Sequence, residues 1–313
     1  MDVEHTKESV SIANPANVHN KFYKGIGAVV LMLNKLRHDY RGYKTPRTFP
    51  MCDYEKATNY DIDIVNKWLF YLSRYSRDVQ IEDKVVLELG PGADLGVGLY
   101  LLFKGVSQYN AVDVNNLIED VPQDFYNYFF RRLENFYLHG KQDIGFLRSQ
   151  LKLTIGNMGD RLNYICRKDF SLSDLEKKSV DLVFSQAAFE HFDNVEATVR
   201  QLGEVCKPGA ILIAIIDLKT HSCWIRDKDP LNIYRYGRSF YNRLKFHGSP
   251  NRLRPFEYER IFNKHGWMDV RTIPRKVLTD EYLKAVLKSL SKEFHDQQNK
   301  MGWLSIILCA KKI

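Results

Sequence analysis

The chain has 313 residues, of which 44% are hydrophobic and 27% charged, and its formal net charge at pH 7 is +8. This composition is typical of a folded globular protein and excludes a mostly disordered chain. No apolar run approaches the roughly 18 residues that a membrane-spanning helix needs, and the polar first twenty residues are not expected to be a secretory signal.

The five cysteines stand at positions 52, 166, 206, 223 and 309 and form no CxxC pair. Their number is odd, and their spacing fits neither a disulfide framework nor a structural metal site. We therefore expect reduced, mostly buried thiols in a cytoplasmic protein.

The first part of the chain is predicted to be helical. Residues 1–20 are expected to form a frayed tail, and apolar residues recur at helical spacing over 25–39 and again over about 60–75. These segments predict a helical N-terminal extension, residues 1–78, ahead of a larger domain, residues 79–313.

From residue 84 onward, short apolar runs alternate with helical patterns. Strands are predicted at 84–89, 108–112, 161–166, 179–185, 210–217, 267–273 and 304–310. Helices are predicted at 95–104, 195–206 and 280–294. This alternation is typical of an α/β fold with a doubly wound, mostly parallel sheet.

Two stretches interrupt this alternation and are predicted to be insertions. The first, about 121–150, is rich in aromatic residues, and the second, 219–254, carries nine Lys/Arg and two acids among interleaved aromatic residues. A second basic segment, from Lys21 to Arg47, has seven Lys/Arg and the single acid Asp39. The positive charge of the chain is therefore concentrated in two segments, 21–47 and 219–254.

A glycine loop follows the first predicted strand of the larger domain. It is Glu88-Leu-Gly90-Pro91-Gly92-Ala-Asp94-Leu-Gly96. Glycine lets the backbone turn sharply and approach a ligand closely. Asp113 ends the next strand, 21 residues after Gly92, where a carboxylate can accept hydrogen bonds from both hydroxyls of a ribose.

The spacing of the loop is GxGxxxG, which differs from the GxGxxG fingerprint of dinucleotide sites. Glu88 and Asp94 would repel a pyrophosphate, whereas they suit the ammonium and sulfonium groups of S-adenosylmethionine (SAM).

Residues 84–217 resemble the class I SAM-dependent methyltransferases. The segments that carry the resemblance are VLELGPGADLG (86–96), Asp113, Asp169-Phe170, SVDLVFSQAAFEHF (179–192) and LGEVCKPGAILI (202–213). The resemblance implies a seven-stranded sheet of order 3-2-1-4-5-7-6 with the last strand antiparallel. It also implies that SAM is the cofactor, with Asp113 at its ribose and Asp169 and Phe170 at its adenine.

The resemblance further places Ser185 and Gln186, at the end of the fourth strand, beside the methionine part of SAM. Two of these positions have simpler explanations. Asp169 could cap a turn or helix, and Gln186 could do no more than end a strand.

Methyl transfer to a hydroxyl needs alignment and a group that removes a proton. Glu190 and His191 follow the fourth strand, and His221 follows the fifth, so all three are candidate catalytic residues on the acceptor side. His191 is the first candidate base because the pKa of imidazole suits neutral pH; the alternative is a histidine with a structural hydrogen bond. No metal is predicted, since Ser185 stands where a metal-binding acid would end the fourth strand.

The acceptor is less well determined than the cofactor. After the fourth strand the sequence is Ser185-Gln-Ala-Ala-Phe189, which lacks the Asn/Asp-Pro-Pro-aromatic motif of enzymes that methylate base amines. Segments 229–235 and 251–255 resemble uncharacterised bacterial methyltransferases associated with surface polysaccharides. The prediction is O-methylation of a sugar, glycan or related small molecule.

The basic insertion has three interpretations. Its Arg235, Arg238 and Arg252 would hold an anionic phosphate or carboxylate of the acceptor, with the basic N-terminal helix near a membrane surface. Alternatively the insertion binds RNA, or its cations form a solvated face over a core of aromatic residues. The alternatives to a small-molecule enzyme are thus an RNA methyltransferase or a SAM-binding subunit without catalysis.

Overall fold

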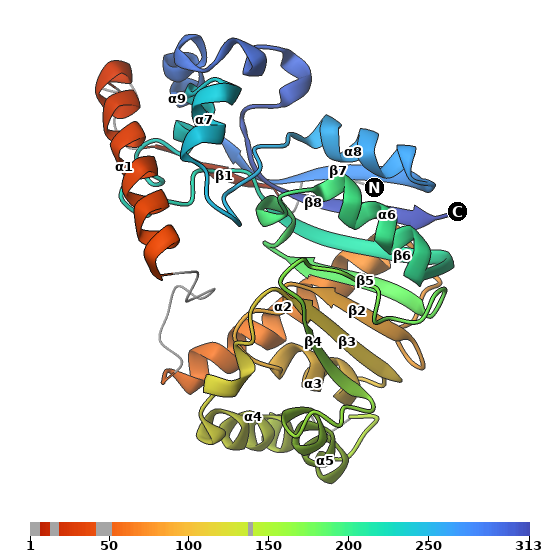
Figure 1. Ribbon diagram of the computed structural model, residues 1–313. Coiled ribbons are helices and arrows are strands. Elements are labelled where there is room, and N and C mark those ends of the chain that lie inside the picture. Colours follow the sequence, from red (N-terminus) through yellow and green to blue (C-terminus); the bar gives the residue numbers. More distant parts are fainter. Residues whose placement is uncertain (1–6, 13–18, 42–51, 137–139) are drawn as a thin grey trace.

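The structure is a computed structural model that describes residues 7–12, 19–41, 52–136 and 140–313. Its centre is one eight-stranded sheet of order β1-β7-β8-β6-β5-β2-β3-β4 (Figure 1). The strands are β1 (Glu8–Val10), β2 (Val85–Leu89), β3 (Gln108–Asp113), β4 (Leu162–Cys166), β5 (Val180–Gln186), β6 (Cys206–Asp217), β7 (Trp267–Leu278) and β8 (Trp303–Lys312). Only β8 runs antiparallel to its neighbours, β6 and β7, as expected for the last strand.

The sheet has eight strands rather than the predicted seven, so its order differs from the prediction by an added edge strand. Strand β1 pairs in parallel with β7, from Glu8 opposite Lys276 to Val10 opposite Leu278. The prediction of a frayed tail is therefore wrong for residues 8–10. A strand of three residues is too short to produce a periodic pattern.

Helices cover both faces of the sheet. On one face α2 (Tyr54–Tyr75), α3 (Gly96–Phe103), α4 (Gln123–Phe136) and α5 (Ile144–Ile155) pack in one hydrophobic cluster, in which the Trp68 and Phe184 rings stack with centroids 5.0 Å apart. On the other face α6 (Val195–Val205) and α8 (Pro255–Lys264) pack in a second cluster. Helix α1 (Asn20–Arg41) lies apart from both layers (Figure 1).

The prediction of a helix over 280–294 is wrong for the second half of that range. Helix α9 (Asp280–Val286) ends early, and the turns η6 (Leu287–Ser289), η7 (Lys292–Phe294) and η8 (Gln297–Asn299) follow it. Buried Tyr282, Val286 and Phe294 all point into a third hydrophobic cluster, so the apolar spacing continued although the helix did not.

The basic insertion packs three of its aromatic residues, Tyr234, Tyr236 and Tyr241, into the same third cluster. It contains η5 (Asn232–Arg235) and α7 (Arg238–Leu244). Tyr234, Tyr236 and Tyr241 are buried, and the Arg235 guanidinium forms a buried ion pair with Asp229, with 2.8 Å from Nε to Oδ2. A large part of the insertion is therefore core rather than surface.

All five cysteines are free, but only Cys206 and Cys309 are buried, so the expectation of mostly buried thiols is wrong. Among the helices of the described residues, none combines the length and the hydropathy that crossing a bilayer requires.

Candidate active site

The glycine loop connects β2 to α3 in the conformation that its glycines allow. Gly90 and Gly92 have φ of +72° and +82°, in the left-handed region that side chains disfavour. A Cβ atom at Gly90 would lie 2.6 Å from the Cβ of Ala188, so only glycine fits against the turn that follows β5. That turn also contains Ala187 at φ +52°. The loop and the turn after β5 thus form one closely packed edge of the sheet.

Asp113 ends β3 beside this loop, where the parallel pairing of β2 and β3 places it. Its carboxylate is 8% exposed and accepts a hydrogen bond of 3.0 Å from the backbone N–H of Asn115. Burial raises the pKa of Asp113, although hydrogen bonds from the backbone of Asn115, Val114 and Gly92 oppose the rise. Asp113 therefore lies against the glycine loop, where a ribose diol could donate to its oxygens.

Glu88 and Asp94 are both buried and already bound within the protein. The Tyr109 hydroxyl donates to Glu88 Oε2 at 2.5 Å, and the backbone N–H of Gly96 donates to Asp94 Oδ1 at 2.7 Å. Pro91 is buried between them in the loop. The two carboxylates hold the loop and make its surroundings negative, while their direct contact with SAM stays a prediction.

The other predicted cofactor residues lie at the same edge. Ser185 is fully buried, and its hydroxyl donates to the carbonyl of Leu89 at 3.0 Å, which ties β5 to β2. Gln186 is half-buried at the end of β5. Ser185 thus has a structural bond, and its role in binding SAM stays a prediction.

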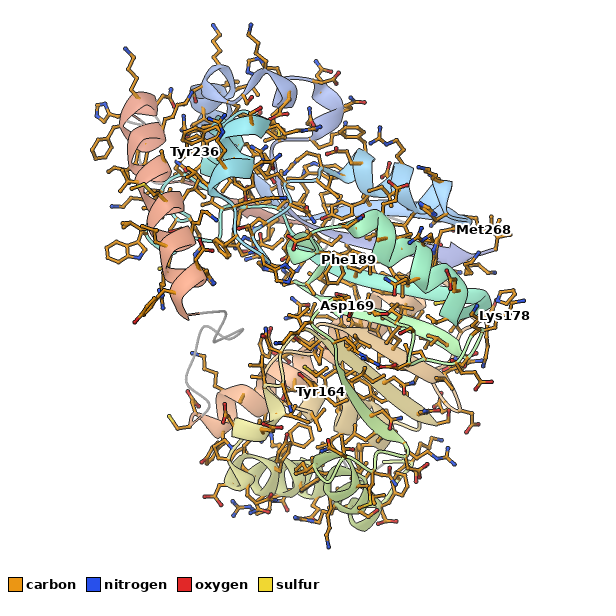
Figure 2. The ribbon with its side chains drawn as sticks, viewed as in Figure 1. Tyr164, Asp169, Lys178, Phe189, Tyr236 and Met268 are labelled. Carbon is orange, nitrogen blue, oxygen red and sulfur yellow. The ribbon has the colours of Figure 1, made fainter. Side chains whose placement is uncertain are left out.

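The loop after β4 approaches this edge from the other side of β3. Asp169 is exposed, and its Oδ1 accepts the backbone N–H of Ser171 at 3.1 Å, so it forms a turn, which is the simpler of its two explanations. Phe170 packs on Phe192, with ring centroids 4.5 Å apart. Figure 2 labels Asp169 and Phe189 at this edge. The apolar ring of Phe170 offers a surface for a flat base; contact with adenine stays a prediction.

Three observations of this structure fit SAM: a loop in which only glycine fits, a buried carboxylate, Asp113, at the predicted ribose position, and two carboxylates, Glu88 and Asp94, around the loop. When bound, SAM supplies an electrophilic methyl group on a sulfonium. Asp113 would bind the ribose, the backbone of residues 90–92 would pack against the methionine part, and Glu88 and Asp94 would favour the cation.

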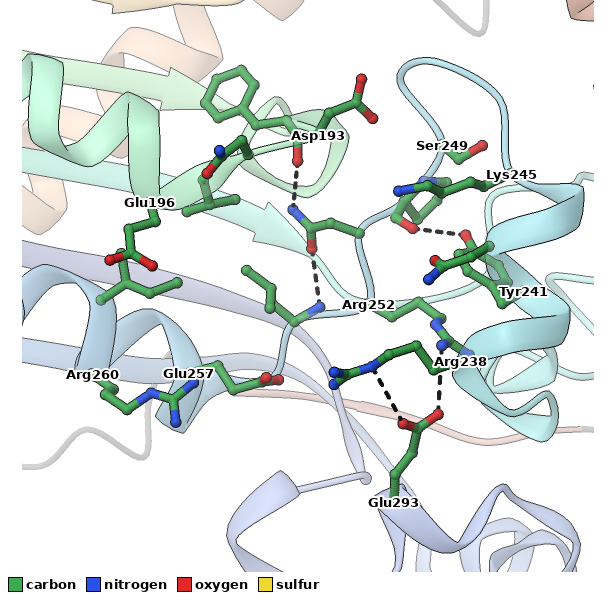
Figure 3. A pocket seen from close by; sticks show the side chains of 18 of the residues that line it. Asp193, Glu196, Arg238, Tyr241, Lys245, Ser249, Arg252, Glu257, Arg260 and Glu293 are labelled. Carbon is green, nitrogen blue, oxygen red and sulfur yellow. Dashed lines mark hydrogen bonds and ion pairs between the residues drawn. The ribbon is translucent and has the colours of Figure 1, made fainter.

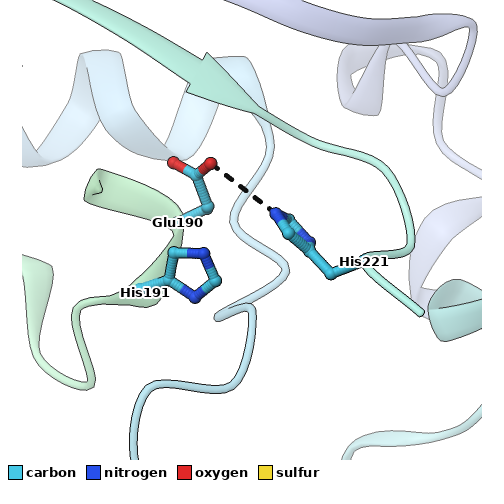
Figure 4. A group of neighbouring side chains, drawn as sticks. All are labelled: Glu190, His191 and His221. Carbon is cyan, nitrogen blue, oxygen red and sulfur yellow. Dashed lines mark ion pairs between the residues drawn. The ribbon is translucent and has the colours of Figure 1, made fainter. Parts of the chain in front are cut away.

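The three predicted catalytic residues come together beyond the ends of β5 and β6 (Figure 4). Glu190 and His191 belong to the turn η4 (Phe189–His191), and His221 follows β6. His221 Nε2 lies 3.7 Å from Glu190 Oε1, and the two imidazole rings have centroids 4.8 Å apart. Glu190 Oε1 also accepts the backbone N–H of Asp217 at 3.2 Å, which joins the group to β6.

The pKa values of His191 and His221 are shifted in opposite directions. Burial lowers the pKa of His191, although the charge of Glu190 opposes this. Burial would also lower the pKa of His221, but the hydrogen bond to Glu190 and the charges of Asp217 and Glu190 outweigh it and raise that pKa. At neutral pH His191 is therefore the neutral imidazole, and His221 is the one that Glu190 favours as a cation.

The orientation of His191 follows from its backbone partner. Its Nδ1 lies 2.6 Å from the carbonyl oxygen of Gly248, and a carbonyl can only accept, so Nδ1 carries the proton. The lone pair of the neutral ring is then on Nε2, where a general base needs it. Glu190 Oε2 and His221 Nδ1 are buried and have no hydrogen-bond partner among the described residues. These two atoms could therefore form hydrogen bonds with a bound molecule.

Residues 248–251 position this group and were not identified from the sequence. Asn251 donates from Nδ2 to the carbonyl of Phe189 at 2.8 Å and from its backbone N–H to the carbonyl of Glu190 at 2.7 Å. The Tyr258 hydroxyl in turn donates to Asn251 Oδ1 at 3.3 Å. The segment 251–255 carried a family resemblance, but no local pattern in the sequence indicates that the chain returns to η4.

The same three residues are the group in the described chain that could hold a metal ion. Their nearest ligand atoms lie within 4.8 Å of one another. Ligands about 2.1 Å from one zinc ion would be roughly 3.4 Å apart in a tetrahedron, so this group is wider than a filled site. The prediction that no metal takes part remains a prediction.

A cavity of about 790 Å³ lies beside this group rather than in it (Figure 3). Its lining includes residues 192–196 and 249–253, which flank the catalytic group, together with α7 and α8, but not the group itself or the glycine loop. Its charges are mixed: Glu293 Oε2 pairs with Arg238 at 3.8 Å and Glu293 Oε1 with Arg252 at 3.5 Å. The cavity is therefore adjacent to the predicted catalytic group and is not lined by it.

Of the three arginines expected to bind an anionic acceptor, two are inside the protein. Arg235 is paired with Asp229, and Arg252 donates from Nη1 to the carbonyls of Ile233 and Tyr236 at 3.2 and 2.6 Å. Only Arg238 is exposed. Arg235 and Arg252 therefore stabilise the insertion and do not present a cationic surface to an acceptor.

Part of the chain matches a known protein family. Residues 148–214, which include β4, β5, η4, α6 and most of β6, match the family model described as a methyltransferase domain. The chain carries a SAM-dependent methyltransferase domain. No curated protein matches this methyltransferase.

Solved structures that are similar to this methyltransferase are distant from it. The phosphoethanolamine N-methyltransferase 2 of Haemonchus contortus in complex with SAM is 15% identical, with 89% of this chain and 59% of that chain covered and a TM-score of 0.44. A SAM-dependent methyltransferase from Aquifex aeolicus is also 15% identical, with 85% and 100% covered and a TM-score of 0.41. Likenesses this distant give no information about the acceptor.

Proposed function

We propose that this methyltransferase transfers the methyl group of SAM to a hydroxyl of a sugar, a glycan or a related small molecule. The observation that carries the proposal is the orientation of His191. Its Nδ1 proton is directed to the carbonyl of Gly248, and burial lowers its pKa, so Nε2 can accept a proton at neutral pH. Such a base is needed by a hydroxyl acceptor.

In the proposed step the acceptor oxygen attacks the methyl carbon, the carbon–sulfur bond breaks with its electrons on sulfur, and the hydroxyl proton passes to His191 Nε2. The imidazolium formed would stand next to the carboxylate of Glu190, whose charge raises the pKa of His191. Glu190 therefore favours the protonated state that exists after transfer. Asn251 and Gly248 act as positioning residues, since they hold η4 and the imidazole ring.

The alternative of an RNA methyltransferase is weakened, because it depended on the charge of the insertion. Three of the nine cations of the insertion, Arg235, Arg252 and Arg254, are buried and bonded within the protein, whereas the other six are partly or fully exposed. Phosphate contacts need accessible cations. The alternative of a subunit without catalysis would leave the arrangement of Glu190, His191 and His221 without a role.

The experiment is the transfer of labelled methyl from SAM into separated extract fractions: glycans, small molecules, total RNA and protein. We expect label in the glycan or small-molecule fraction, in a product that resists mild base because a methyl ether does not hydrolyse. Label that is released by ribonuclease would overturn the hydroxyl proposal in favour of RNA. Unlabelled fractions with SAM binding intact in calorimetry would favour the subunit without catalysis.

A further inference from the structure

Helix α1 carries an exposed apolar face that the rest of the described chain does not cover. At 100° per residue its members fall within about 120° of the helix circumference, the width of an apolar helix face. They are 37–88% exposed. The members, which we call the α1 stripe, are Phe22, Ile26, Val29, Met32, Leu33, Leu36 and Tyr40.

The opposite face of α1 already attaches the helix to the protein. Gly27 is buried so closely against Asn232 and Tyr236 that a Cβ atom would collide with both side chains. Asn232 Nδ2 donates to the carbonyl of Tyr23 at 2.8 Å, and the Tyr236 hydroxyl donates to the carbonyl of Lys24 at 2.7 Å. The α1 stripe is therefore not needed to hold the helix in place. Its side chains are exposed, and the helix lies at the edge of the molecule (Figure 1).

The charges beside the stripe are basic. Lys21, Lys24 and Arg37 are exposed, and the acid of the helix, Asp39, forms an ion pair with Lys35 at 3.2 Å. Two copies of this helix packed through their stripes would bring like charges together, which disfavours a second copy as the occupant. A negatively charged surface with an apolar interior would accommodate both the stripe and the cations.

We propose that α1 is a membrane-surface helix that lies on a bilayer containing anionic lipid. The α1 stripe would enter the boundary between headgroups and acyl chains, and Lys21 and Arg37, which flank it, would remain among the headgroups. The attraction between these basic residues and anionic headgroups is electrostatic, so salt weakens it. This inference does not depend on which acceptor is methylated.

The test uses the full chain and two kinds of vesicle, phosphatidylcholine alone and phosphatidylcholine with one-third phosphatidylglycerol. We expect sedimentation with the anionic vesicles that weakens as salt rises, and at least tenfold weaker binding by the double variant Leu33→Glu, Leu36→Glu. The matched control is Ile155→Glu, Met158→Glu, which adds the same charge at two exposed apolar positions elsewhere and should bind as the unaltered chain does. Far-UV circular dichroism confirms folding, because all four positions are exposed.

Three results would overturn the proposal. One is the absence of binding to anionic vesicles by the unaltered chain, and another is equal binding by the two double variants. The third is a dimer, measured by light scattering, that the Leu33→Glu, Leu36→Glu pair separates into monomers without any vesicle binding by the dimer. That result would identify the stripe as an interface between two copies.

Discussion

The two halves of the site are built differently. On the predicted cofactor side, one continuous stretch of chain, residues 88–113, forms the glycine loop, the side chains that support it and the predicted ribose acid, Asp113. On the acceptor side, Glu190 and His191 are held by Gly248 and Asn251, nearly sixty residues away. A local arrangement leaves a motif in the sequence, whereas an arrangement made by distant segments leaves only its separate residues. The strongest tests of this contrast are substitutions on the acceptor side.

Replacement of His191 by alanine should have the largest effect. Loss of a general base lowers the rate by roughly 10²–10⁴-fold. We expect that fall in kcat with nearly unchanged SAM affinity in calorimetry, since His191 lies outside the cofactor loop. His265→Ala is the control, because His265 follows α8, pairs with Glu196 on α6 and touches neither half of the site. Full turnover by His191→Ala would show that His191 is not the general base.

Asp229→Ala should destabilise the insertion strongly. The Asp229 and Arg235 side chains are both fully buried, and removal of one member of a buried ion pair costs about 3–5 kcal/mol. We expect a fall of this size in the free energy of unfolding, measured by chemical denaturation. Arg238→Ala removes an exposed cation of the same insertion and should change that free energy by less than about 0.5 kcal/mol. Equal effects would mean that the insertion is a charged surface after all.

Asp113→Ala should weaken SAM binding by at least tenfold, or about 1.4 kcal/mol, because two ribose hydrogen bonds are lost. Calorimetry with the folded variant measures this directly. Asp169→Ala is the comparison on the same edge of the sheet: its carboxylate is exposed and bonded to Ser171, so we expect a smaller loss. Unchanged affinity in Asp113→Ala would refute the ribose assignment.

Removal of metal ions by a chelator should have the smallest effect on the rate of methyl transfer. Treatment with EDTA followed by desalting should leave the methyl-transfer rate within twofold of the untreated protein, because the ligand atoms of Glu190, His191 and His221 are spread over 4.8 Å. A loss of activity that zinc or magnesium restores would instead assign these three residues to a metal site.

The features that could be predicted from the sequence are those that depend on local contacts. The predicted strands from 84–89 to 304–310 all occur within a few residues, because buried parallel strands are short apolar runs that end in turns. The three catalytic candidates were found because each follows a strand at the same edge of the sheet. Strand β1 was not predicted, because three residues are too few to show the alternation of apolar and polar side chains that is typical of a strand.

The arginines of the insertion show what composition could not predict. Arg235 is counted as a positive charge in the sequence whether it faces solvent or Asp229. Its burial depends on Asp229, Asn20 and Ser289, and Asn20 is more than two hundred residues away along the chain. Charge density in a segment therefore says little about surface charge when aromatic residues in the same segment form a core.

The most direct test of the proposed base is the pH dependence of methyl transfer. A base must be unprotonated, so the rate should fall as pH decreases through the pKa of His191, which burial places below the usual 6.5. Glu190 raises this pKa, so Glu190→Gln should move the fall to lower pH. We predict an acidic limb that shifts downward in Glu190→Gln. A rate without an acidic limb, or a limb that the substitution leaves in place, would contradict His191 as the base.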